Sequence, residues 1–377
     1  MKIIHVIESL AGAGGGLPAA VKSLAVLQES MGYTVGFAAT AMKADASASD
    51  TGMVRHLKGA GFFASLGRKL AFFRAILAHE YDFVHVHGLW NLSFIAICLC
   101  CKLSGTKYVV TTHGQLLSTI LRADSFAKRL KKQLYQSIVG KAILRSAYKV
   151  HVSSENERLE FLRNPWLAKK VNLIPHIIDP IFFSWRDNDA GAGAGAGAGK
   201  FKDILFVGRL DPRKGVLDLI EGFAQSRLAP EWRLRLVGPS SDVAFMDAIS
   251  NAIAAAGVRD RVLVESPVYG DLRPALYASC YVFCLPSYSE APGLVNIEAA
   301  LLARPVVTTP YTGLFDIADS GGVLCGTGAG AISAALNQVA NWSPAEYQAR
   351  SQRIRQWAES MHSLDALVPS WRAFYSE

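Results

Sequence analysis

The sequence has no apolar run long enough to cross a bilayer. Its most apolar stretch, LSFIAICLCC at residues 92–101, is about half of the ~20 residues that a membrane-spanning helix needs. The N-terminal residues MKIIHVIESL are apolar from the start and no cleavage site follows, which predicts a first buried strand rather than a signal peptide. The sequence therefore predicts a cytoplasmic protein.

Metal-ligating patterns are also lacking. None of the six cysteines belongs to a Cys-x-x-Cys pair or stands beside a histidine at zinc spacing. All six lie in apolar surroundings, which indicates buried reduced thiols. Asp179 and Asp211 fall in expected loops without partners at ligand spacing. We therefore expect no metal site.

Charged residues are few, at 19%, whereas hydrophobic residues reach 51%, which excludes a disordered chain. With 377 residues the chain exceeds the size at which a single core stops growing, so two domains are expected. The net charge of +8 is compatible with phosphorylated substrates, an anionic membrane or nucleic acid.

Short apolar runs alternate with helix-length segments along the chain, as in a parallel sheet covered on both faces. The pattern predicts an α/β fold with two doubly wound domains that face each other across a cleft. The first spans 1–183, and an Ala-Gly-rich linker spans 184–200. The second spans 201–359, and a helix over about 360–377 is expected to return to the first domain.

A glycine-rich loop follows the first expected strand and precedes a helix that Pro18 opens. Gly15 and Gly16 belong to this loop, where backbone N–H groups can approach a phosphate. A dinucleotide site is disfavoured, because the second expected strand ends in Ala39-Thr40-Ala41-Met42 without the acid that grips a ribose. The alternative is that the glycines only form a tight loop.

Two cations follow the first strand of the second domain, in VGRLDPRKG. Arg209 and Lys214, beside Gly208 and Gly215, are expected at one sheet edge, where they could hold a diphosphate by charge-assisted hydrogen bonds. The alternative is two solvated surface charges.

The stretch PSYSEAPGLVNIEAA places Glu290 on a loop and Glu298 in the next helix. Ionised carboxylates only accept hydrogen bonds, so they suit the hydroxyls of a sugar or ribose. The helix N-terminus, with the amides of Gly293, Leu294 and Val295, suits a phosphate. The alternative is that Glu298 only complements the helix dipole and Glu290 is a loop charge.

Much of the positive charge falls in residues 125–149, where cations alternate with leucines and an isoleucine at helical spacing. This predicts an amphipathic basic helix that could lie on anionic lipid, or else a solvated helix face. Nucleic acid is not an expected partner, because no RNA-binding motif or stacking aromatics accompany the charge.

Together these motifs resemble those of the retaining nucleotide-sugar glycosyltransferases of family four, which have the GT-B fold. The resemblance runs in order over nearly the whole chain, and the paired glutamates with the upstream Arg and Lys are its most specific part. The motifs that carry it are GGGLPAAV, HVHG, TTHG, VGRLDPRKG and PSYSEAPGLVNIEAALLARPVV.

The resemblance implies that Arg209 and Lys214 stabilise the diphosphate leaving group and that Glu298 holds the ribose hydroxyls. It implies that Glu290 contacts the donor sugar, and that the amides of 293–295 meet the phosphates. No metal or other cofactor is then needed, because the two cations replace a divalent ion.

In the first domain, His113 in TTHG matches a histidine near the reacting sugar, and Gly15 and Gly16 match a glycine pair that closes on the substrates. His87, in HVHG, is expected to be a structural hydrogen-bonding residue. The chain departs from the family at Ala291-Pro292-Gly293, often Gly-Phe-Gly, which bears on sugar specificity.

The expected function is transfer of a UDP- or GDP-linked sugar to a glycan or lipid-linked saccharide in bacterial surface polysaccharide synthesis, with peripheral attachment to the inner membrane face. Two alternatives remain. One is a nucleotide-sugar epimerase or hydrolase on the same fold, and the other is a catalytically silent nucleotide-binding partner subunit.

Overall fold

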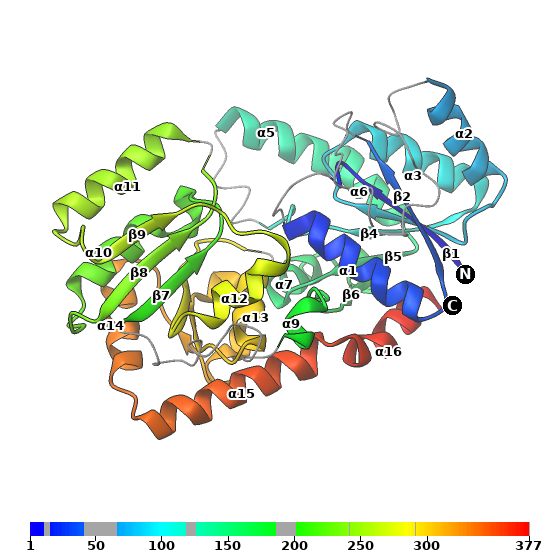
Figure 1. Cartoon of the computed structure of the whole chain (residues 1–377). Helices are drawn as coiled ribbons and strands as arrows, with labels where there is room; N and C mark the ends of the chain where they lie inside the picture. Colours follow the sequence, from blue (N-terminus) through cyan, green and yellow to red (C-terminus); the bar gives the residue numbers. More distant parts are fainter. Residues whose placement is uncertain are drawn as a thin grey trace. The chain divides into compact units, whose positions relative to one another are not determined.

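The structure is a computed structural model that describes residues 1–10, 16–40, 66–117, 126–185, 201–240, 242–290 and 292–376. The chain forms two compact units, one comprising Met1–Ile177 with Leu367–Glu377 and the other Ile178–Ala366. Each is built around a parallel six-stranded sheet (Figure 1), so the predicted α/β class is confirmed. The Ala-Gly tract of the expected linker lies outside the described residues.

The first unit has the strand order β2-β1-β3-β4-β5-β6. Its strands are β1 (Lys2–Ile7), β2 (Thr34–Ala39), β3 (Phe83–His87), β4 (Lys107–Thr111), β5 (Lys149–Val152) and β6 (Val171–Leu173). Its helices are α1 (Gly16–Ser30), α2 (Leu66–Leu77), α3 (Leu92–Ser104), α5 (Phe126–Tyr135), α6 (Lys141–Ser146), α7 (Glu155–Leu162), α8 (Pro165–Ala168) and α16 (Leu364–Tyr375).

The two faces of this sheet differ in chemistry. On one face, alternate residues such as Ile4, Val84 and Val110 form an apolar core with residues of α2, α3 and α6. The opposite face carries buried polar side chains that the strand register brings into line. His5 pairs with His85 across β1 and β3, and Thr111 pairs with His87 and His151 on its two sides. The side chains of these five residues are buried: His5, His85, His87, Thr111 and His151.

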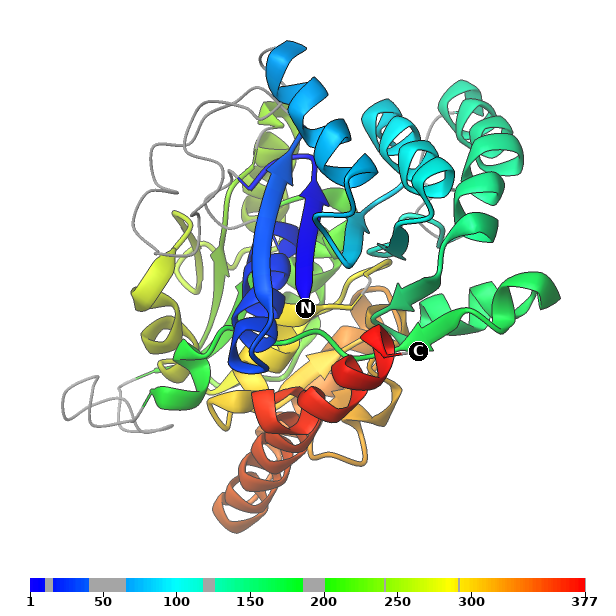
Figure 2. The same ribbon diagram turned by 90° about the vertical axis from the view of Figure 1, so that its right-hand side faces the viewer.

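From Leu367 onward the C-terminal helix belongs to the first unit, as the sequence predicts. Figure 2 shows α16, in red, alongside the blue β1 and α1. Tyr375 accepts a hydrogen bond from Gln28 of α1, and its ring packs edge-on against Phe83 of β3. Phe374 and Trp371 pack against His85 and His151, so α16 covers the polar face of the sheet together with α1.

The second unit has the strand order β12-β11-β10-β7-β8-β9. Its strands are β7 (Lys202–Val207), β8 (Trp232–Val237), β9 (Val262–Glu265), β10 (Val282–Leu285), β11 (Val306–Thr308) and β12 (Val323–Leu324). Its helices are α9 (Ile181–Ser184), α10 (Val216–Gln225), α11 (Val243–Ala255), α12 (Arg273–Ala278), α13 (Leu294–Leu301), α14 (Ala329–Ala340) and α15 (Pro344–His362). The strand order reverses between β7 and β10, and the carboxyl ends of such strands are where doubly wound sheets bind ligands.

The basic segment differs from the single helix predicted over 125–149. Helix α5 continues through a π-helical turn, Gln136–Gly140, into α6, which ends at Ser146. Ala147 has an extended ψ of 143°, and Lys149 already begins β5. The prediction is therefore wrong at its C-terminal end, because β5 must pair with β4. Among the helices of the described residues, none combines the length and apolarity needed to cross a membrane.

The six cysteines are free thiols. Five of them are buried, as the sequence predicts, but the prediction is wrong for Cys100, which is only half-buried. Burial raises the pKa of Cys98 and of Cys284, and it raises that of Cys280 to about 12. These thiols therefore stay protonated and pack as small apolar groups.

The place of α16 in the first core can be tested with Phe374→Ala. The side chain is 1% exposed, so its removal should lower the free energy of unfolding by about 3–5 kcal/mol. Arg372→Ala, an exposed residue of the same helix, should change it by less than about 0.5 kcal/mol. Urea unfolding followed by circular dichroism measures both. Equal midpoints for the two variants would show that α16 is not part of this core.

Candidate functional site

The loops after β7 and β10 in the second unit start at the point where the strand order reverses. Gly208 and Arg209 follow β7 directly, and Glu290 lies on the loop that follows β10. The predicted residues from two distant parts of the sequence therefore leave neighbouring strands at the same edge of the sheet. Arg209 is exposed, and it forms no ion pair within the part of the chain that the structure describes.

A short 3₁₀ helix, Pro212–Lys214, places Lys214. The Asp211 carboxylate caps this helix by accepting a hydrogen bond from the Arg213 amide at 2.9 Å. Gly215 ends it with a φ of 70°, and a Cβ there would lie 2.3 Å from the Pro286 carbonyl oxygen. Glycine is required because the backbone adopts a left-handed conformation directly against the β10 loop.

The Lys214 ammonium donates a hydrogen bond to the Glu290 carboxylate and forms an ion pair with it. Ser287 Oγ donates to the same carboxylate oxygen at 2.8 Å, and the Glu290 amide donates to the Tyr311 carbonyl at 2.9 Å. The side chains of Lys214 and Glu290 are only 19% and 14% exposed, which strengthens their attraction. The structure thus brings together two predicted residues that lie far apart in the sequence.

Glu298 belongs to a separate network. It lies within α13, and its buried carboxylate accepts hydrogen bonds from Arg273 Nη1 at 3.0 Å and from the Tyr277 hydroxyl. Arg273 Nη2 also donates to Asp179 at 2.6 Å. Burial raises the pKa of Glu298, and the positive charge of Arg273 partly offsets this. Glu298 is therefore fixed in place by two other side chains.

Sequence reasoning missed Arg273 and Tyr277, and it treated Asp179 as an isolated loop residue. The sequence contains only a weak indication that these residues act together. Arg273 and Tyr277 are four residues apart on α12, which places both on one helix face. Only the packing of α12 against α13 reveals that this face meets Glu298.

The N-terminus of α13 begins at Gly293, the cap, followed by Leu294 and Val295. The Gly293 amide donates to the Thr312 carbonyl at 3.3 Å, and the Leu294 amide donates to the Pro292 carbonyl at 3.0 Å. Two of the three amides predicted to meet a phosphate therefore already have acceptors. A phosphate would compete with these bonds.

In the first unit, His113 follows β4 in a left-handed conformation, with a φ of 47°. The buried Glu157 carboxylate anchors this turn by accepting hydrogen bonds from the Thr112 hydroxyl and the Gly114 amide. Ser153 donates to the other carboxylate oxygen from its amide at 3.0 Å and from its hydroxyl at 3.2 Å. Glu157 thus positions His113, and no sequence motif had singled it out.

Of the two predicted glycines, Gly16 is the exposed first residue of α1, and Gly15 lies outside the described residues.

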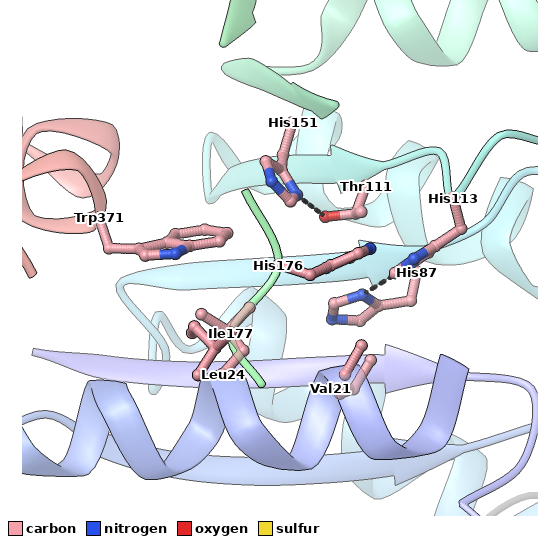
Figure 3. Close-up of a pocket in the computed structure, with 10 residues that line it drawn as sticks. Val21, Leu24, His87, Thr111, His113, His151, His176, Ile177 and Trp371 are labelled. Carbon is pink, nitrogen blue, oxygen red and sulfur yellow. Dashed lines mark hydrogen bonds between the residues drawn. The ribbon is translucent and has the colours of Figure 1, made fainter. Parts of the chain in front are cut away.

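His113 and His87 are joined by a hydrogen bond of 3.0 Å between His113 Nε2 and His87 Nδ1, as Figure 3 shows. Both rings line a cavity of about 10 Å³ that also contacts Thr111, His151 and Trp371. Such a volume holds one water molecule at most. Burial lowers the pKa of His113 to about 3, and a smaller electrostatic effect from His151 acts in the same direction. His113 is therefore neutral at physiological pH.

His5, His85 and His87 could hold a metal ion, because their ring nitrogens lie within 4.8 Å of one another. The spacing of these residues in the sequence does not predict such a group. All six ring nitrogens take part in hydrogen bonds. A metal ion would have to replace some of these bonds, so hydrogen bonding accounts for the cluster.

The two halves of the chain match two family models. Residues 15–176 match the glycosyl transferase 4-like domain, and residues 195–357 match the glycosyl transferases group 1. The chain is 27% identical to the D-inositol 3-phosphate glycosyltransferase of Mycolicibacterium smegmatis, over 81% of this chain and 70% of that protein. It is 28% identical to an uncharacterised glycosyltransferase of Methanocaldococcus jannaschii, over 63% of this chain and 60% of that protein.

Solved glycosyltransferase structures match the whole fold. The sucrose-phosphate synthase of Thermosynechococcus elongatus has a TM-score of 0.74 at 22% identity, over 100% of this chain and 98% of that one. The Anabaena protein HepE, in complex with UDP and glucose, has a TM-score of 0.74 at 19% identity, over 99% and 98%. The two models together cover most of the chain and identify it as a glycosyltransferase, and the solved structures show that its fold is of the GT-B type.

Proposed function

We propose that the protein transfers a sugar, with retention of configuration, from a nucleoside diphosphate sugar to a hydroxyl group of a glycan or lipid-linked saccharide. The observation that carries this proposal is the Lys214–Glu290 ion pair, which lies with Arg209 at the edge where the strand order of the second sheet reverses. Cations at this edge suit a diphosphate, and a carboxylate suits sugar hydroxyls.

Arg209 and Lys214 would stabilise the negative charge that develops on the leaving diphosphate. Both are fixed positive charges, so donor binding would need no divalent cation. The Glu290 carboxylate is neutralised by Lys214, which makes it a poor nucleophile. This favours a displacement in which the departing phosphate itself takes the proton of the incoming hydroxyl.

Glu298 would accept hydrogen bonds from the ribose hydroxyls, because Arg273 and Tyr277 already hold its carboxylate in one orientation. The base would be uracil or guanine. The solved structure of HepE is a complex with UDP and glucose, which favours testing a UDP-linked donor first. The amides at the start of α13, 293–295, would meet the phosphates.

The basic segment supports a membrane-associated acceptor, such as a lipid-linked saccharide for surface polysaccharide at the inner face of the membrane. Leu130, Leu134 and Ile138 recur every four residues and are 55%, 61% and 64% exposed. Lys131, on the same segment, is also exposed. Exposed apolar side chains interleaved with cations suit an interface with anionic lipid.

Lys214→Met tests the role of the cation. Loss of one donor to the leaving group should lower kcat by about 10²–10³-fold while the fold survives. Release of UDP or GDP from a panel of sugar donors measures this, with and without saccharide acceptors. Lys169→Met, at an exposed position in the first unit, is the control and should keep its rate. A near-normal rate in Lys214→Met would refute the assignment.

Product analysis with the donor alone, together with the calorimetric titration described next, separates the alternatives. Conversion of the donor without any acceptor would indicate an epimerase or hydrolase. Nucleotide binding without any turnover would indicate a catalytically silent subunit.

Glu298→Gln tests the nucleotide site by calorimetric titration with UDP and GDP in the absence of metal. Glutamine keeps the shape but loses the charge, so the preferred nucleotide should bind about 1.5–3 kcal/mol more weakly. Glu221→Gln, an exposed residue of α10, should bind like the wild type. If neither nucleotide binds the wild-type protein, the diphosphate site is absent and the proposal fails.

Co-sedimentation with vesicles tests the membrane surface. The wild type should bind phosphatidylglycerol vesicles, lose binding at high salt and ignore phosphatidylcholine vesicles. The triple variant Leu130→Ser, Leu134→Ser, Ile138→Ser should lose binding. Leu103→Ser, 77% exposed on α3, should keep it. Equal binding by the triple variant and the wild type would exclude this surface.

A further inference from the structure

One continuous chain of hydrogen bonds runs through the polar face of the first sheet. It joins four strands, α1, α16 and the loops after β4 and β6, and all its members belong to the first unit. In order along the bonds, the members are Ile174, His151, Thr111, His85, Tyr375, Gln28, His5, His87 and His113. Figure 3 shows two of its links, Thr111–His151 and His87–His113.

The five histidines of this hydrogen-bond chain are neutral. Burial lowers the pKa of His5 and of His151 to about 4 and that of His113 to about 3. Burial also lowers the pKa values of His85 and His87, and repulsion from neighbouring histidines adds to the effect. A neutral imidazole has one N–H donor and one acceptor nitrogen, so each ring transmits a direction along the chain.

The direction is set at one end by a backbone carbonyl, which can only accept. The Ile174 oxygen lies 2.8 Å from His151 Nε2, so His151 carries its proton there and its Nδ1 is an acceptor. Thr111 Oγ1, at 2.9 Å, must donate to this Nδ1, and it then accepts from His85 Nε2 at 2.6 Å. His85 Nδ1 is thus an acceptor, and the Tyr375 hydroxyl donates to it at 2.7 Å.

The second half follows from the first. The Tyr375 oxygen, having donated its proton, accepts from Gln28 Nε2 at 2.8 Å. Gln28 Oε1 then faces His5 Nε2 at 2.7 Å, so His5 donates from Nε2 and accepts at Nδ1. His87 Nε2 donates to this Nδ1 at 2.8 Å, and His113 Nε2 donates to His87 Nδ1 at 3.0 Å.

The opposite direction of the hydrogen bonds is unfavourable at the bond between His151 and Ile174. Reversing every bond would move the proton of His151 to Nδ1 and turn the lone pair of Nε2 toward the Ile174 oxygen. Two buried acceptors would then face each other at 2.8 Å with no proton between them, which leaves both unsatisfied. The same argument fixes the orientation of the Gln28 amide, because its nitrogen must face Tyr375.

We propose that this chain locks His113 in the Nε2–H tautomer, so that Nδ1 is a hydrogen-bond acceptor reserved for a hydroxyl group of the substrate. Within the described residues, no side chain or backbone group donates to Nδ1. A locked neutral ring cannot donate from Nδ1 to a phosphate oxygen, but it can accept from a hydroxyl group, and under the proposed function the hydroxyl groups are those of the sugar substrates. The identity of that substrate rests on the proposed function, whereas the tautomer does not.

His87, His5, Gln28 and Tyr375 are then positioning residues for His113. They touch no substrate in this scheme and act by dictating which nitrogen of His113 carries the proton. The Glu157 anchor fixes where the ring lies, and the hydrogen-bond chain fixes its polarity.

Nitrogen NMR of protein labelled with ¹⁵N-histidine tests the tautomer directly at neutral pH. Each histidine of the chain should show a protonated Nε2 and an unprotonated Nδ1. A wild-type His113 with a protonated Nδ1, or with both nitrogens protonated, would overturn the inference. The readout needs no substrate, so its result is independent of whether Lys214→Met abolishes glycosyl transfer.

Tyr375→Phe tests whether the chain is the cause. Loss of the hydroxyl leaves the Gln28 amide free to rotate, and its nitrogen can then donate to His5 and reverse the bonds toward His113. We expect His113 to change from a single tautomer to a mixture of the two. Tyr148→Phe, which removes a hydroxyl bonded to the Ser376 carbonyl of the same C-terminal segment, should leave one tautomer.

If Tyr375→Phe fails to fold, Gln28→Leu replaces it, because it removes the same directional link from α1. A single unchanged Nε2–H tautomer of His113 in a folded variant would refute the role of the chain. Under the proposed function, His113→Leu should lower kcat/KM by about tenfold through loss of the acceptor. His113→Asn should lose less, since asparagine tolerates the positive φ and its amide oxygen can replace Nδ1.

Discussion

The first unit depends on a single constraint, that a buried polar group needs a hydrogen-bond partner. Parallel sheets covered by helices usually have two apolar faces. In this sheet, β1, β3 and β5 carry histidines on one of the two faces. These rings are stable in the core only because each of their nitrogens meets a complementary group from a strand, from a loop that follows a strand, from α1 or from α16. The C-terminal helix is therefore a chemical part of this unit, since Tyr375 joins its two sets of histidines.

The same constraint shapes the second unit with charges in place of neutral rings. Lys214 and Glu290 neutralise each other at the end of the sheet, and Glu298 is held between Arg273 and Tyr277. Buried or half-buried charges are tolerated in such pairs because each charge compensates the other. Removing one partner would leave the other charge buried and uncompensated. A substrate that binds here must replace these contacts with equivalent ones, which favours ligands rich in both phosphate oxygens and hydroxyls.

In the first unit, the neutral state of the His113 ring determines which ligand groups it can bind. A positively charged His113 would attract a phosphate, whereas a neutral ring with a fixed lone pair selects for a hydroxyl group. The Gln28 amide adds a second property, because it transmits the direction of the bonds but does not pass a proton on readily. The hydrogen-bond chain thus fixes which nitrogen of His113 carries the proton, but it does not supply a path for proton transfer between His113 and the core.

Local sequence pattern was enough to predict the α/β class, the return of the C-terminal helix and the position of Arg209, Lys214 and Glu290 beyond the ends of strands. Alternating strands and helices place the ends of strands such as those before Arg209 and Glu290 on one side of a sheet. The pattern also indicated buried thiols, but it extended the basic helix too far, because pairing of β5 with β4 overrides helical periodicity.

The partners of these residues follow from packing in three dimensions and not from the sequence pattern. Arg273 reaches Glu298 because α12 packs against α13. Glu157 lies on α7 and reaches the turn of His113, which follows β4. The histidine chain was hidden because its members come from β1, β3, β5 and the far C-terminus, and spacing along the sequence carries no information on strand register. Direction in that chain depends on one carbonyl, at Ile174, whose position is set by the fold alone.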